Sequence, residues 1–440
     1  MTLFRIRDIR SLYAHGNRTV RAKTRVEMSF SRRSLERIAE AIAIVGVVAL
    51  HIVYFLLCLR KGHIDPGVDG EVYRQLARDY LNSPTLLGEN CKIVFWTPWY
   101  LFIAAVGATQ GGVFLLQLSV FTISLVAVLN VAKKLGMNRY WPTLAVLSYG
   151  LYWPTFDYVV FYQYENFLAW GVITTLCLLG ANRARLERET WRWLAAGIVV
   201  GLTVLAHSRV AGLAILCGII FVSVCLRTRR FLWLPAVAFM VPLLLPTFLW
   251  GVRNRLLWGQ WIFSSTSFGY NLYVGFNPVA TGSFMPQPPY PPLDQAAQMA
   301  WDFIRSHPSR ALELILWKLI RYWEISEPSQ FGPSLFLWQE RVLMPLGLVG
   351  YAIGLWRTLR RLWTLRLNLF EETSSTILFS TVFMITYFQI FHAIFYVFTP
   401  RFRIPAMPII SLLGIWVLWE AWTNCSEKRG TKCLKSADTP

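Results

Sequence analysis

Three acidic residues lie within seven positions of one another directly after the first long apolar run of the sequence. They are Asp65, Asp69 and Glu71. A carboxylate can take a proton from an attacking hydroxyl, and partial removal from water makes it a stronger base. Asp65 has a second interpretation, a turn with Pro66 and Gly67, and Asp69 is also a favoured cap for a following helix. The cluster is a candidate source of a general base.

Several arginines stand at the ends of later apolar runs. Arginine matches the geometry of phosphate bidentately, so arginines facing a set of carboxylates favour a reaction on an anionic, lipid-linked substrate. The alternative for each arginine is that its side chain reaches lipid headgroups from a helix end. The candidates for phosphate binding are Arg253, Arg209, Arg401 and Arg403, and Glu165 opens another apolar run.

The composition indicates what kind of protein positions these residues. Of 440 residues, 55% are hydrophobic and 15% are charged, against roughly 45–50% and about 25% in soluble proteins. The formal net charge is +19, but the apolar content excludes the open basic surface that a nucleic-acid partner needs. We therefore expect a multi-pass membrane protein whose positive charge lies in cytoplasmic loops.

Apolar windows recur along the whole chain. A helix needs roughly 20 apolar residues to cross a bilayer, which predicts an all-α polytopic protein with about ten transmembrane helices. An eleventh span from Pro98 is the alternative, but it would move Lys133 and Lys134 to the outside, so we expect a juxtamembrane helix there. The predicted spans are residues 38–59, 112–132, 141–155, 166–180, 193–206, 210–226, 231–251, 338–356, 376–398 and 404–422.

Basic residues assign the two sides of the membrane. Alternating the spans puts the basic loops on the side of the N-terminal arm, as the positive-inside rule requires. This predicts a disordered cytoplasmic arm (1–37), a transmembrane domain (38–422) and a cytoplasmic tail (423–440). Two long loops, about 60–110 and 252–337, fall on the external face, where we expect amphipathic helices lying along the membrane.

Several short motifs occur in order along these loops and spans. They are Asp69–Arg78 with Tyr73 four residues after the aspartate, Thr97-Pro98-Trp99-Tyr100-Leu101, Glu165, His207-Ser208-Arg209, the long run from Arg253-Asn254 through Gly269-Tyr270-Asn271-Leu272 to Gly275-Phe276-Asn277-Pro278, and Arg401-Phe402-Arg403-Ile404-Pro405. Each motif is short, but their shared order is hard to produce by chance.

In this order the motifs resemble those of the bacterial GT-C class of polytopic glycosyltransferases, which includes protein O-mannosyltransferases and the lipid A aminoarabinose transferase. The long run is similar to the Arg-Asn…Gly…Ser-x-x-x-Gly-x-Asn-Leu-x-x-Gly-x-Asn-Pro run of many bacterial members. The resemblance covers most of the chain from His51 to Trp422. It departs where the family has a charged pair before its proline-rich helix, since Phe95 and Trp96 stand there. That departure leaves the donor's sugar open.

The resemblance implies an enzyme that moves a hexosyl or pentosyl group from a polyprenyl-phosphate donor to an acceptor hydroxyl, with inversion. Asp69 would be the general base, with Asp65 and Glu71 as alternatives. The four arginines would bind the donor's phosphate, in the bacterial inner membrane with the site on the periplasmic face. The acceptor would be a glycolipid, an oligosaccharide or a protein. The residues expected to contact substrate are Tyr73, Glu165, Asn254, Tyr270 and Asn271.

Two other functions fit a protein with many spans. A flippase or transporter of lipid-linked saccharides would carry its charges within spans and show paired repeats, whereas here the charges concentrate in external loops. An O-antigen-type polymerase or ligase typically has one dominant external loop, and this chain has two. We expect no required cofactor, and the histidines are too scattered to predict a metal site, although some relatives in this broad class use a divalent cation.

Overall fold

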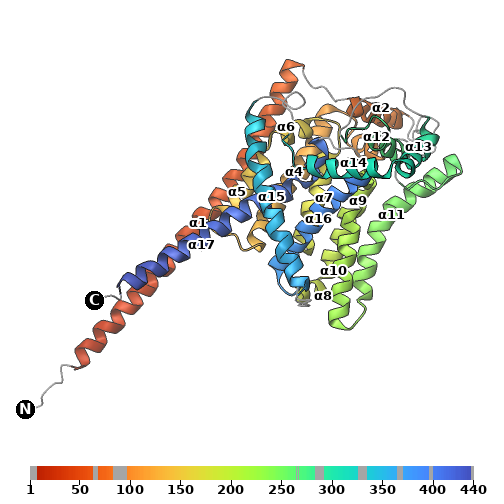
Figure 1. The fold of residues 1–440 in the computed structure, drawn as a ribbon. Helices are drawn as coiled ribbons and strands as arrows, with labels where there is room; N and C mark the ends of the chain where they lie inside the picture. The colour runs from red at the N-terminus through yellow and green to blue at the C-terminus, as the bar shows by residue number, and fades with distance from the viewer. Residues whose placement is uncertain are drawn as a thin grey trace, which may run out of the picture.

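The computed structural model describes residues 7–62, 68–82, 97–263, 265, 267–282, 292–325, 334–363, 370–395 and 400–437. Within these ranges the chain forms helices, turns and short 3-10 segments, and no strand (Figure 1). The all-α class predicted from the sequence is confirmed for the described residues.

Among the described residues, seven helices are long and apolar enough to cross a membrane. Two shorter apolar helices, α7 (Glu165–Leu179) and α9 (Thr190–Ala206), pack against each other. Each of these nine helices overlaps a span predicted from the sequence. The seven long helices are α1 (Arg7–Lys61), α4 (Gln110–Lys134), α10 (Gly212–Thr228), α11 (Trp233–Trp258), α15 (Ser334–Trp363), α16 (Thr373–Phe395) and α17 (Met407–Ala437).

The predicted span 141–155 is not one helix. It divides into α5 (Trp141–Gly150) and α6 (Trp153–Val160), because Pro154 has no amide to donate to a preceding carbonyl and its ring clashes with a continuous helix. The side chain of Gln339 on α15 bonds both sides of the break: it donates to the Leu151 carbonyl at 2.6 Å and accepts from the Trp153 amide at 2.9 Å. A broken helix is tolerated in a bundle when a neighbour satisfies its backbone in this way.

Glycine allows two helix pairs to approach closely. A Cβ atom at Gly201 of α9 would lie 2.3 Å from the Pro242 carbonyl oxygen of α11, and one at Gly350 of α15 would lie 2.6 Å from the Leu413 carbonyl oxygen of α17. Small residues at such contacts are characteristic of helices that pack in membranes.

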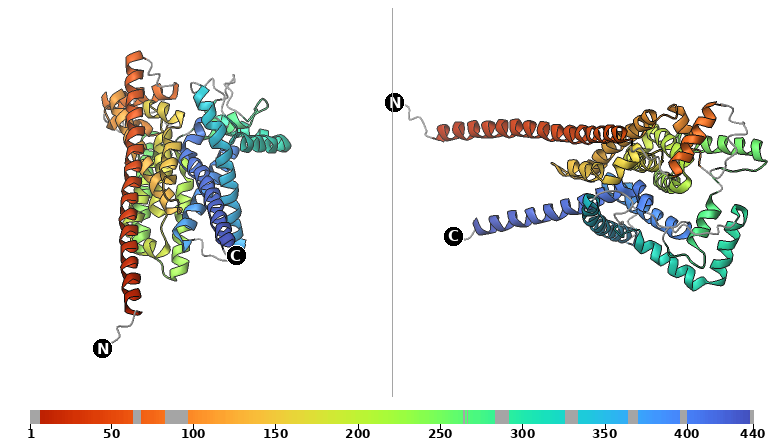
Figure 2. Two further views of the ribbon diagram at one scale, coloured as in Figure 1. Left: turned by 90° about the vertical axis from the view of Figure 1, so that its left-hand side faces the viewer. Right: turned by 90° about the horizontal axis from the view of Figure 1, so that it is seen from above.

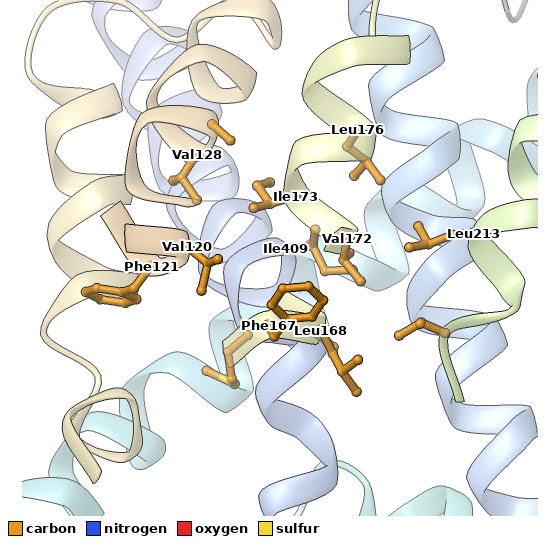
Figure 3. Close-up of a cluster of buried hydrophobic side chains, with 14 of the residues drawn as sticks. Val120, Phe121, Val128, Phe167, Leu168, Val172, Ile173, Leu176, Leu213 and Ile409 are labelled. Carbon is orange, nitrogen blue, oxygen red and sulfur yellow. The ribbon is translucent and has the colours of Figure 1, made fainter. Parts of the chain in front are cut away.

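Branched and aromatic side chains fill the centre of the bundle (Figure 3). They come from α4, α7, α10 and α17, and they are buried together in one cluster. The labelled members are Val120, Phe121, Val128, Phe167, Leu168, Val172, Ile173, Leu176, Leu213 and Ile409. This core fixes α7 against α4 and α17, and so fixes the position of the first residue of α7, Glu165.

The two chain ends lie at one end of the bundle, and a layer of shorter helices lies at the other. In Figures 1 and 2, α1 and α17 project together toward the N and C labels. The opposite end carries α2 (Val68–Asn82), α12 (Phe268–Gly275), α13 (Leu293–Ser306) and α14 (Pro308–Arg321). The remaining short elements are α3 (Trp99–Ala105), α8 (Arg183–Arg188), η2 (Ser208–Val210) and η5 (Pro400–Ala406).

Helix α14 has two apolar faces. Ala311 and Leu314 are buried, whereas Leu312, Leu316 and Ile320 are exposed at one-turn spacing. In Figure 1, α14 runs across the direction of the long helices. This is the placement expected for an amphipathic helix in the second long loop.

Helix α1 is continuous from Arg7, so residues 7–37 are helical, whereas the sequence predicts disorder for the arm 1–37. The division into arm, transmembrane domain and tail stays a prediction.

Candidate functional site

Four segments meet at the end of the bundle opposite the chain termini. They are the first turn of α2, the turn between α6 and α7, the 3-10 turn η2 after α9, and the 3-10 segment η5 before α17. Each segment lies at a helix end, where some backbone N–H and C=O groups have no hydrogen-bond partner within the helix. The charged residues that they bring together are Asp69, Glu165, Arg209 and Arg401.

Asp69 and Arg401 form an ion pair at the surface of this site. Arg401 donates from Nη1 to Oδ2 of Asp69 at 2.6 Å, across 332 positions of sequence. The side chains keep 30% and 27% of their surface exposed, for Arg401 and Asp69 respectively. Both groups are therefore accessible to a substrate while they bind each other.

A second pair lies fully buried behind the first. Nη2 of Arg209 is 3.9 Å from Oε1 of Glu165, too long for a hydrogen bond, and both side chains are at most 1% exposed. Within the described chain, Nε, Nη1 and Nη2 of Arg209 and Oε2 of Glu165 have no hydrogen-bond partner. A buried charge without hydrogen bonds is costly, so this pair has hydrogen-bonding capacity that the described residues leave unused.

The ring of Phe402 connects the two arginines. The guanidinium of Arg209 lies 4.5 Å from the ring centre, and that of Arg401 lies 5.3 Å from it. Arg209 also lies 5.4 Å from the ring of Tyr164. Stacking on aromatic rings holds a guanidinium in place while leaving its N–H groups free to bind an anion.

Neutral aromatic groups surround these charged residues. The hydroxyl of Tyr73 lies 3.1 Å from Oγ1 of Thr97, and its ring packs edge-on against Tyr164. Burial raises the pKa of Tyr73 well above its usual value, so the phenol stays protonated. Burial, with Arg209 nearby, lowers the pKa of His207 well below its usual value, and Nδ1 of His207 accepts from the Arg209 amide at 3.0 Å. The charges of the site therefore come from two arginines and two carboxylates.

Arg403 lies two residues from Arg401 but belongs to a different environment. It is fully buried and donates from Nη2 to Oε1 of Glu340 at 2.9 Å. From Nη1 it donates to the carbonyls of Tyr322 and Glu324 at 3.3 and 2.5 Å. The same Glu340 oxygen accepts from the Tyr152 hydroxyl at 2.7 Å. The structure thus joins Arg403 to α15 and to the break between α5 and α6, away from Asp69.

Arg253 and Asn254 are also occupied within the protein. Arg253 donates to Oδ1 of Asn254 at 2.7 Å and lies 4.5 Å from the ring centre of Trp250. Asn254 in turn donates to the Ile262 carbonyl at 2.6 Å. These contacts fix the loop after α11.

The other predicted residues divide in the same way. Tyr270 packs against the small cluster formed by Val274 and Phe402, whereas Asn271 donates to the carbonyl of Ser267, directly before its own helix, at 2.9 Å. Glu71 is paired with Arg74 on α2 at 2.5 Å. Asp65 lies outside the described residues.

The sequence analysis gave no individual role to Phe402, Tyr164 or His207. Phe402 stands between the two arginines of a motif singled out for its charges, and Tyr164 directly precedes Glu165. Their positions beside charged candidates are the signal that was available. Within the described residues, no group of three or more His, Cys, Asp or Glu side chains could hold a metal ion.

The geometry supports one kind of chemistry. A half-exposed carboxylate can take a proton, and two guanidiniums on one ring can bind an anionic group beside it. Because the site lies at one end of a bundle of apolar helices, a substrate with a lipid tail and an anionic head can reach it from a membrane.

The sequence and the structure were compared with those of known proteins. No family model and no curated protein matches the sequence, and three chains among the solved structures match. One is the crystal structure of ArnT from Cupriavidus metallidurans bound to undecaprenyl phosphate, with 15% identity and a TM-score of 0.36, covering 84% of this chain and 76% of that one. At this TM-score the similarity by itself assigns no activity to the chain.

Proposed function

We propose that this chain is a GT-C-type membrane glycosyltransferase that moves a sugar from a polyprenyl-phosphate donor to an acceptor hydroxyl, inverting the anomeric centre. The observation that carries the proposal is the Asp69–Arg401 ion pair beside the buried Arg209. Here a carboxylate able to take a proton lies next to guanidiniums able to bind a phosphate. The seven long apolar helices support a donor that is held in a membrane.

In the proposed reaction, the acceptor oxygen bonds to the anomeric carbon while the bond from that carbon to the phosphate oxygen breaks. The electron pair of the broken bond goes to the phosphate, and the hydroxyl proton goes to Asp69. The departing lipid phosphate gains one negative charge in this step. Arg401 and Arg209 stabilise that charge because fixed cations in a partly dehydrated site need little reorganisation.

The proposed placement is the bacterial inner membrane. About ten spans would put both chain ends in the cytoplasm and the site on the periplasmic face. The shared position of the two ends, opposite the site, supports this arrangement. The acceptor is a glycolipid, an oligosaccharide or a protein, since each offers a hydroxyl of suitable reactivity.

A donor-consumption assay tests the proposal. Membranes containing the wild-type chain, Asp69→Asn or Asp79→Asn receive labelled polyprenyl-phosphate sugars together with envelope acceptors. Asp79 is the matched control, because it is an acid on the same helix that pairs with Gln75 at the surface. We expect the wild type and Asp79→Asn to consume one donor, and Asp69→Asn to be slower by about 10²–10⁴-fold.

Two results would contradict the proposal in different ways. Equal rates for wild type and Asp69→Asn would move the base to another carboxylate, of which Glu71 and Asp65 are the nearest in sequence. Turnover of no donor, together with labelled lipid crossing the bilayer, would favour a flippase.

A further inference from the structure

The Asp69–Arg401 pair presents a conflict for the proposed reaction. The base takes a proton on a carboxylate oxygen, yet Oδ2 of Asp69 is engaged by a charge-assisted hydrogen bond of 2.6 Å. The phosphate needs guanidinium donors, yet Arg401 gives one of its donors to Asp69. In the structure, each group therefore takes up part of the binding capacity that the reaction needs from the other.

The buried side of the site shows how the conflict is resolved. Arg401 lies near two carboxylates, Asp69 and Glu165, and stacks on the same ring as Arg209. Arg209 has N–H groups without partners in the described chain. Arg209 is fully buried, so it attracts a phosphate at Arg401 through a charge that no hydrogen bond to Glu165 satisfies. A phosphate at Arg401 is thus stabilised by a second guanidinium, whereas among the described residues Asp69 forms its ion pair with Arg401.

We propose that the donor's phosphate displaces Asp69 from Arg401, so that the base is released only when the donor is bound. This inference rests on the proposed function and adds an order of binding, donor before activation of the acceptor. An acceptor alone meets a carboxylate of which one oxygen is already engaged by a guanidinium. Wasteful proton transfer in the absence of donor is prevented by the same contact.

The charges of the reaction balance around Arg401. With donor bound, the two arginines face two carboxylates and one phosphodiester charge. When the hydroxyl proton moves to Asp69, this carboxylate becomes neutral and the lipid phosphate becomes doubly charged, so the total is unchanged. Arg401 lies between the group that loses a negative charge and the group that gains one. No other reactant is needed.

Binding of a polyprenyl monophosphate without sugar tests the exchange separately from turnover. The labelled lipid is titrated against purified full-length protein, as wild type, Asp69→Asn, Asp69→Ala and Asp79→Asn. If Asp69 competes with phosphate for Arg401, both Asp69 variants bind the lipid more tightly than wild type. The expected gain is about fivefold, the factor that matches a half-exposed ion pair of ~1 kcal/mol. Asp79→Asn removes the same charge from α2 and leaves binding unchanged.

Each outcome decides between the proposals. Tighter binding by both Asp69 variants, but not by Asp79→Asn, supports exchange. Equal or weaker binding by the Asp69 variants overturns exchange and leaves the glycosyltransferase proposal in place. An equal gain in Asp79→Asn assigns the effect to general surface charge and also overturns exchange. Failure of the wild type to bind the lipid overturns the proposed function itself.

Discussion

Arg401 and Arg403 are two residues apart on η5, and the molecule uses them in opposite ways. Arg403 is fully buried, and its donors go to Glu340 and to two backbone carbonyls. Arg401 is 30% exposed and donates to one carboxylate, Asp69. A guanidinium whose donors are filled by the protein contributes to holding helices together. One that is accessible and has a single exchangeable partner can bind a ligand. Hydrogen-bond partners, rather than charge, therefore distinguish the two arginines, and they make Arg401 the candidate for binding a ligand.

The largest expected effect is on stability, at Arg403, the buried one of the two arginines. Replacing Arg403 by methionine leaves Glu340 buried without its cation, and breaking such a pair costs about 3–5 kcal/mol. We expect a clearly lower midpoint of thermal unfolding, measured by the fluorescence of the chain's 20 tryptophans. The double variant Arg403→Met with Glu340→Met should recover part of the loss, because no charge is then left alone. If Arg403→Met unfolded at the same midpoint as the wild type, the ion pair between Arg403 and Glu340 would not contribute to holding the helices together.

The reverse pattern is expected for Arg401. Arg401→Met removes a fixed donor to the developing phosphate charge, which typically lowers turnover by about 10²–10³-fold. Its ion pair is partly exposed to solvent, so the free energy of unfolding should change by less than about 1 kcal/mol. Turnover and thermal midpoint are measured on the same preparation. If Arg401→Met lowered the midpoint as far as Arg403→Met does, the contrast between the two arginines would be lost.

The contrast also shows what the sequence could predict. Hydropathy located the apolar helices because burial in a bilayer requires long apolar runs. It did not predict the break at Leu151. Pro154 was visible in the sequence, but Pro242 and Pro246 lie inside the continuous helix α11, so a proline alone does not locate a break. The contacts of Gln339 that satisfy the broken backbone come from a distant helix and have no local signal. The motif around Phe402 pointed to both arginines, since spacing alone does not say which one faces the site. In a 3-10 segment, residues two apart point roughly two-thirds of a turn from each other.

The same limit applies to Arg253 and Asn254. Their residue types suit phosphate and sugar, and the sequence predicts such roles. In the structure, Asn254 donates to the Ile262 carbonyl and accepts from Arg253. Whether a polar side chain serves the loop or a ligand is decided by tertiary contacts, which have no short-range signal. Asp69 was accessible to prediction because it opens a helix next to an apolar span.

Lys318 is another cation at this end of the molecule and offers an intermediate case. It is 2% exposed, and its Nζ contacts the Ala393 carbonyl at 3.2 Å and the ring of Phe276 at 3.7 Å, rather than a carboxylate. Burial lowers the pKa of Lys318 from 10.5 to about 7. Between these values the unfolded chain binds a proton that the folded chain has lost, so stability rises with pH from about 7 toward 10.5. The slope is at most ~1.4 kcal/mol per pH unit.

This dependence is measured as the difference between wild type and Lys318→Met across that range of pH, since other groups titrate in both proteins. We expect the unfolding midpoint of the wild type to rise relative to that of Lys318→Met as the pH rises. Lys61→Met, at an exposed lysine at the end of α1, should follow the wild type. A constant difference between wild type and Lys318→Met would show that Lys318 keeps its proton in the folded chain.

The smallest expected effect concerns the choice of base. Glu71 is two residues from Asp69 on α2, but it pairs with Arg74 on its own helix and remains 45% exposed. A surface pair of this kind contributes about 0.2–0.5 kcal/mol, and the structure gives Glu71 no contact with Arg401. We expect Glu71→Gln to lower turnover by less than about tenfold, far from the 10²–10⁴-fold loss expected for Asp69→Asn. If Glu71→Gln lowered turnover more than Asp69→Asn did, the base would be Glu71. The Asp69–Arg401 ion pair, which joins residues 332 positions apart, would then be structural, as the contacts of Arg403 are.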